Sequence, residues 1–65
     1  MNQDEINLME WDLAHIDTLI DQVGELCAKR FPRNEEVSKR MKSIRSAYKR
    51  LTETLLMEMY KETNR

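Results

Sequence analysis

One helix-breaking segment, Phe31-Pro32-Arg33-Asn34, constrains this 65-residue chain more than any other feature. Pro32 lacks the backbone N–H that a helix interior requires, and its ring pushes the preceding Phe31 away from helical dihedral angles. The chain contains no other proline, and its one glycine stands alone inside an otherwise helical pattern. The sequence therefore predicts two long helices joined by a short turn at residues 31–34.

Capping signals place the ends of these helices. Asn2 and Glu5 have the spacing of a capping box, and Asn34 is a favourable N-cap for the second helix. We expect helices at about residues 3–30 and 35–63. Because so short a connection folds two helices back on each other, the sequence predicts one all-α domain over residues 1–65, an antiparallel two-helix hairpin.

Apolar residues recur at alternating spacings of three and four in both helices, which is the heptad pattern of a coiled coil. The predicted seam, forming the core of the hairpin and of a dimer, consists of Ile6, Met9, Leu13, Ile16, Ile20, Val23, Cys27, Val37, Met41, Ile44, Tyr48, Leu51 and Leu55. In the second helix Glu58 falls where the next apolar residue is due, and Met59 follows one position later. Leu19 and Leu26 make the stripe of the first helix wider than one neighbouring helix needs.

The small size of the chain, like the wide apolar stripe, favours association with a second chain. A chain of this length buries only about 60% of the surface that its unfolded form exposes. Its single cysteine cannot form an intrachain disulfide, and no Cys/His cluster has the spacing of a zinc site. We therefore expect a homodimer in which two hairpins form a four-helix bundle.

Charge is segregated along the chain, although the formal net charge is only -1. Residues 1–28 carry seven acids and no Lys or Arg, whereas residues 29–50 carry nine bases and two acids. In an antiparallel hairpin, position i should lie beside position 65 − i, so much of the basic segment should pair with acids of the first helix. The alternative is a dimeric RNA- or DNA-binding regulator, for which the basic outer surface would comprise Lys39, Lys42, Arg45, Lys49 and Arg50.

Catalytic and metal-binding residue patterns are weak. His15 is the only histidine and has no well-placed acidic partner, and Cys27 lies on the predicted seam, where it would act as a small hydrophobic residue. We expect no enzyme activity, cofactor or metal. The longest apolar run, Leu55 to Met57, is far too short to span a membrane, and the N-terminus lacks the pattern of a secretory leader, so we expect a soluble, cytoplasmic protein.

Apolar residues away from the seam provide the main functional signal. The predicted partner-binding patch, at the open end of the hairpin, consists of Leu8, Trp11, Leu56, Met57 and Tyr60. Aromatic residues and Met are enriched at protein interfaces. In size and outline the chain resembles small dimeric helical-hairpin regulators, inhibitors and secretion co-chaperones, an analogy of fold alone. The sequence thus favours a non-enzymatic protein-protein interaction module.

Overall fold

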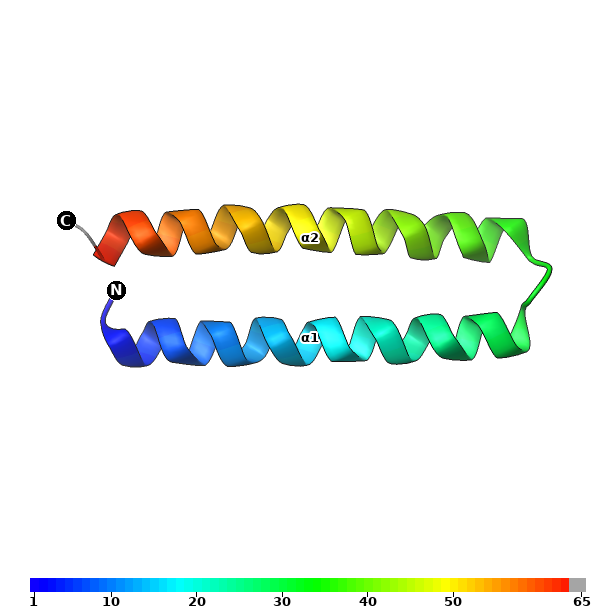
Figure 1. The fold of residues 1–65 in the computed structure, drawn as a ribbon, viewed down its shortest axis with the longest axis horizontal. Helices are drawn as coiled ribbons and strands as arrows, with labels where there is room; N and C mark the ends of the chain where they lie inside the picture. Colours follow the sequence, from blue (N-terminus) through cyan, green and yellow to red (C-terminus); the bar gives the residue numbers. More distant parts are fainter. Residues whose placement is uncertain (64–65) are drawn as a thin grey trace.

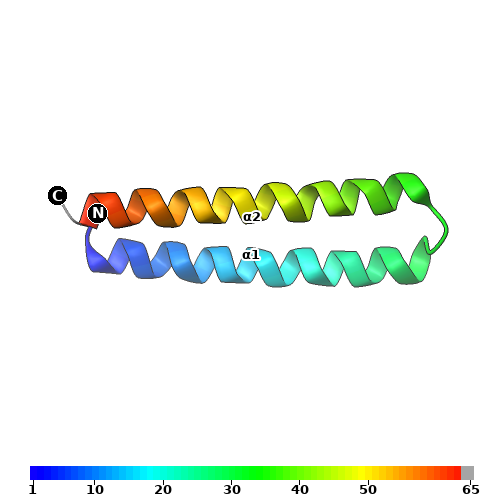
Figure 2. The ribbon, with the colours of Figure 1, turned by 45° about the horizontal axis from the view of Figure 1, so that its top comes forward.

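A computed structural model describes residues 1–63 as two helices lying side by side in a hairpin (Figure 1). Helix α1 spans Gln3–Arg30 and helix α2 spans Glu35–Thr63. Figure 2 shows the same pairing along the whole length of the helices, with residues 31–34 closing one end. The all-α hairpin and both helix boundaries are confirmed. We call the end with residues 31–34 the turn end and the opposite end the open end.

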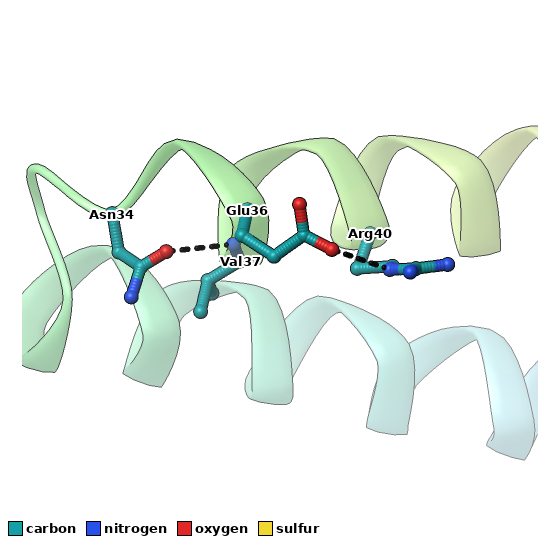
Figure 3. A network of polar contacts seen from close by, with 4 residues as sticks. All are labelled: Asn34, Glu36, Val37 and Arg40. Atoms are coloured by element: carbon teal, nitrogen blue, oxygen red, sulfur yellow. Dashed lines mark hydrogen bonds and ion pairs between the residues drawn. The ribbon is translucent and has the colours of Figure 1, made fainter.

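Side-chain caps explain where the helices begin. The Asn2 side-chain oxygen accepts a hydrogen bond from the Glu5 N–H at 2.8 Å, and the Asn34 side-chain oxygen accepts one from the Val37 N–H at 3.0 Å (Figure 3). Each bond satisfies an N–H that has no partner within the helix itself. At the end of α1, the Phe31 N–H donates to the Cys27 carbonyl oxygen at 2.8 Å. The predicted N-caps are therefore confirmed.

Cross-helix neighbours establish the register of the hairpin. A Cβ atom built on Gly24 would lie 3.5 Å from the Cε atom of Met41, and the Asp21 carboxylate accepts a hydrogen bond from the Arg45 guanidinium at 2.5 Å. The residue numbers of both pairs add up to about 65, as predicted. Residues in the turn-side half of one helix thus lie beside residues in the turn-side half of the other.

The hairpin has almost no core of its own. Within residues 1–62, only Ile6 and Met59 are buried, and both lie near the open end. Half-buried residues mark the rest of the line along which the helices touch: Met9, Leu13, Ile20, Gly24 and Cys27 of α1, and Val37, Met41, Tyr48, Thr52 and Leu55 of α2. The chain exposes 5768 Å², whereas a compact monomer of 7.8 kDa exposes about 4,400 Å².

Four residues of the predicted seam are more exposed than the rest and lie at the margin of the helix contact: Ile16, Val23, Ile44 and Leu51, each between 42% and 50% exposed. On α2 the half-buried line instead includes Thr52 and continues to the buried Met59, seven residues later. The shift in apolar spacing that is visible at Met59 therefore already applies at Thr52, one heptad earlier in α2. One helix covers only part of a stripe as wide as the one on its neighbour. In this hairpin, the covered part includes Gly24 of α1 and Thr52 of α2.

Candidate functional site

The hairpin has two broad faces, one on each side of the line where α1 and α2 touch. Successive residues are about 100° apart around a helix, so neighbouring residues at the contact point toward opposite faces. Asp17 and Arg45 border the same groove and define the groove face. Their neighbours Ile16 and Ile44 therefore lie on the other side, which we call the apolar face.

The apolar face carries a continuous stripe of exposed apolar side chains. Its members, placed by the same helical spacing, are Ile16, Leu19, Val23 and Leu26 of α1 and Ile44, Ala47 and Leu51 of α2. The six larger side chains are each between 42% and 58% exposed. Large contiguous apolar surfaces are rare on monomeric soluble proteins and mark sites of association. The apolar face is therefore the strongest candidate site in the described part of the chain.

The groove face differs from the apolar face because charged and polar groups cross it. A groove of about 560 Å³ lies between the helices and is bordered by Asp17, Lys49 and Glu53, among others. The Arg45 guanidinium passes over Gly24 to reach the Asp21 carboxylate. Both partners of this ion pair are about half exposed, so it contributes at most about 1 kcal/mol to stability.

A hydrogen bond from Tyr48 fixes one point of the helix contact. Its hydroxyl donates to the carbonyl oxygen of Leu13 on the opposite helix. That carbonyl already belongs to the helical backbone, so the bond joins the two helices without interrupting α1. The apolar ring of Tyr48 lies on the predicted seam, and its polar tip gains a partner that the sequence pattern did not identify.

The five residues of the predicted open-end patch are all exposed but differ in their direction around the helices. Leu56 and Tyr60 border a small groove with Gln3, Ile6 and Glu10, and neither Leu8, Trp11 nor Met57 contributes to its walls. By helical spacing, Leu8 lies beside the apolar face, whereas Trp11 and Met57 lie on the outer surfaces of their helices. The partner-binding role of these five residues stays a prediction; helical spacing places them in more than one direction around the hairpin, because equal height along the hairpin does not give equal direction around each helix.

Basic residues of the alternative nucleic-acid surface divide between two environments. Arg45 pairs with Asp21, and Lys49 borders the groove that also contains Asp17 and Glu53. By helical spacing the remaining three, Lys39, Lys42 and Arg50, lie farther around α2, toward the outside of the hairpin. The cross-helix pairing expected from the charge segregation is present at Asp21 and Arg45.

Residues considered for chemistry are far apart. His15 is exposed on α1, and Cys27 is a half-buried free thiol that borders a small groove with Phe31 and Pro32 at the turn end. Among residues 1–63, no group of three or more His, Cys, Asp or Glu side chains is arranged to hold a metal ion. Neither described helix is both long enough and apolar enough to cross a lipid bilayer.

Thr52 and Gly24 are two contact residues that the seam pattern missed, because neither is a large apolar residue. The Thr52 hydroxyl is shielded from solvent and, among the described residues, makes no hydrogen bond. The signal that could have found Thr52 is the phase of Met59, since position 52 lies one heptad before it. Comparison with known protein families, curated proteins and solved structures finds no match for this chain.

Proposed function

We propose that this chain is a non-enzymatic protein-protein interaction module that works as a homodimeric four-helix bundle. The apolar face carries this proposal. Its stripe of half-exposed Ile, Leu and Val side chains runs along the middle of α2 and from the middle of α1 toward the turn end, where a second hairpin would cover it. A regulator, inhibitor or co-chaperone of this size gains a stable scaffold by pairing with itself.

The large exposed area of the hairpin supports a second copy of the same chain as its binding partner. The lone hairpin exposes about 1,400 Å² more than a compact monomer of its mass. Specific interfaces bury about 800 Å² per partner, and obligate homodimers bury more. Covering the apolar face in a dimer would thus remove an excess of the expected size and give each chain an ordinary ratio of surface to mass.

Light scattering tests the dimer directly. At tens of micromolar, the protein should show about twice the 7.8 kDa chain mass, and its melting temperature should rise with concentration by mass action. Leu19→Lys should abolish the dimer, because a charge would be buried in the apolar face. Leu56→Lys is the matched control on the groove face and should leave the mass unchanged. A concentration-independent monomer would refute the proposal.

A further protein partner is the reason for calling the dimer an interaction module. Trp11, Met57 and Tyr60 are between 62% and 77% exposed and lie outside the apolar face, so dimerisation leaves them available. Tagged protein should be isolated from its native host with and without nuclease, using Trp11→Ala as the comparison. A partner protein that survives nuclease and is lost with Trp11→Ala supports the module. Recovery of nucleic acid alone contradicts it and favours the alternative regulator.

A further inference from the structure

The two ends of the hairpin carry opposite charge. At the turn end, residues 29–40 contain five bases and two acids. At the open end, residues 1–12 and 53–62 contain seven acids, one lysine and the N-terminal amine. Folding thus converts the sequential segregation of charge into an axial one, because the acidic start of α1 lies beside the acidic end of α2 (Figure 1).

The apolar face reproduces this polarity along each helix. On α2, the positions that continue the stripe at spacings of four and three are Arg40, Ile44, Ala47, Leu51, Thr54 and Glu58. The row begins with a base near the turn end, is mainly apolar in the middle, and ends with an acid near the open end. On α1 the corresponding row runs from Glu5 and Asp12 at the open end to Arg30 at the turn end.

The α2 row is complementary to its own reverse. It is symmetric about residue 49, so a copy running in the opposite direction would place Arg40 beside Glu58, and Ala47 beside Leu51. Thr54 would likewise lie beside Ile44. The small Ala47 would leave room for the larger Leu51, and the bases would meet acids. On α1, Glu5 and Arg30 are related in the same way about the middle of that helix, whereas Asp12 would lie beside the apolar Val23.

We infer that two copies join through the apolar face in antiparallel orientation, with the turn end of each hairpin beside the open end of the other. This arrangement rests on the homodimer proposed above and specifies its geometry. Each helix then lies along the same helix of the second copy, reversed. The parallel alternative would bring the two basic turn ends together and the two acidic open ends together, and like charges at close range repel.

Arg40 already has a partner within its own helix, the Glu36 carboxylate at 3.0 Å (Figure 3). Both side chains of this pair are more than two-thirds exposed, so the pair is weak and leaves the guanidinium in contact with solvent. A planar guanidinium has several N–H donors and can bind two carboxylates at once. The same side chain can therefore also serve a carboxylate of the second copy.

Spin-label distances distinguish the two orientations. With Cys27→Ser to remove the native thiol, a label at Arg33→Cys marks the turn end and a label at Thr18→Cys marks the middle of α1. In the antiparallel dimer, the turn labels should be separated by about 40 Å, the length of a 28-residue helix. The middle labels should be only about two helix diameters apart, roughly 20 Å.

Each outcome of the spin-label measurement either supports or contradicts the antiparallel dimer. A long turn-label distance with a short middle-label distance supports the antiparallel dimer. Short distances for both labels would overturn the orientation while leaving the homodimer intact. Absence of any distance between copies, together with the monomer mass, would refute both. The dimer mass of each labelled variant should be checked first, so that a loss of assembly is not mistaken for an orientation.

Charge-reversal variants give an independent test of the antiparallel dimer. Arg30→Glu with Arg40→Glu should raise the dimer dissociation constant by on the order of tenfold at low salt, because each dimer loses its favourable contacts twice. Lys39→Glu with Lys42→Glu makes the same change in net charge on the outside of α2 and should have little effect. Adding Glu5→Arg and Glu58→Arg to the first variant should restore affinity. Failure of this restoration would contradict the antiparallel pairing.

Discussion

Leu51 and Leu56 form a matched pair of probes for the apolar face. Both are leucines of α2 with similar exposure, 50% and 44%, but they lie on opposite faces of the hairpin. Replacing either with alanine removes three carbon atoms. At about 0.8 kcal/mol per fully buried carbon, half-burial gives a loss of about 1 kcal/mol per chain for each variant in a lone hairpin. The same Leu-to-Ala change in one helix cancels differences in helix propensity.

In a four-helix bundle, the expected loss of stability becomes larger for Leu51→Ala but not for Leu56→Ala. If the second copy covers Leu51, Leu51→Ala leaves a cavity in a packed core and should cost about 2–5 kcal/mol per site, twice in each dimer. Leu56→Ala stays near 1 kcal/mol per chain, because the groove face remains open. The dimer should therefore lose roughly 4–10 kcal/mol with Leu51→Ala and about 2 kcal/mol with Leu56→Ala.

Urea unfolding followed by far-ultraviolet circular dichroism measures both losses. The curves should be fitted to dimer unfolding at several protein concentrations, so that the dissociation constant and the unfolding free energy are determined together. Equal losses for the two variants would refute the reasoning, because they would show that Leu51 is no more buried in solution than Leu56.

Three further substitutions test details of the hairpin. Thr52→Val should stabilise the protein by about 1–3 kcal/mol in urea unfolding, because it removes a shielded hydroxyl that makes no hydrogen bond within the described residues; Thr18→Val, at an exposed site, is the control and should change stability little. Gly24→Ala should be neutral or stabilising by up to about 1 kcal/mol, since the gain in helix propensity competes only with displacement of the flexible Arg45 side chain. A thermal melt showing clear destabilisation would contradict that balance. Trp11→Ala, at a site 77% exposed, should change folding stability by no more than about 0.5 kcal/mol and leave the dimer mass intact; a melted or dissociated variant would assign Trp11 to the protein's own core.

Local signals were sufficient to predict the helices. Pro32 ends the first helical segment and Asn34 caps the second, and both effects act within a few residues of the chain. The register also followed from local information, since a short turn leaves little freedom for two antiparallel helices to slide. The pair formed by Asp21 and Arg45 lies where that register places it.

Direction around each helix could not be predicted in the same way. Leu8 and Trp11 lie at about the same height as Leu56 and Met57, but helical spacing gives them different directions around the hairpin, because position along the axis and angle around it are independent. A sequence gives relative angles within one helix. Only the packing of one helix on another decides which angle faces inward.

The heptad spacing determined that each helix carries an apolar stripe wide enough for more than one neighbour. Tertiary structure decided how that stripe is divided. The intrachain contact uses Gly24 and Thr52 together with the larger residues of the helix contact, whereas Ile16, Val23, Ile44 and Leu51 remain half exposed. The physical reason is that one helix can cover only a limited arc of its neighbour. Which arc is covered depends on side-chain fit across the contact, such as the space that Gly24 leaves for Arg45 and the reach of Tyr48 to Leu13.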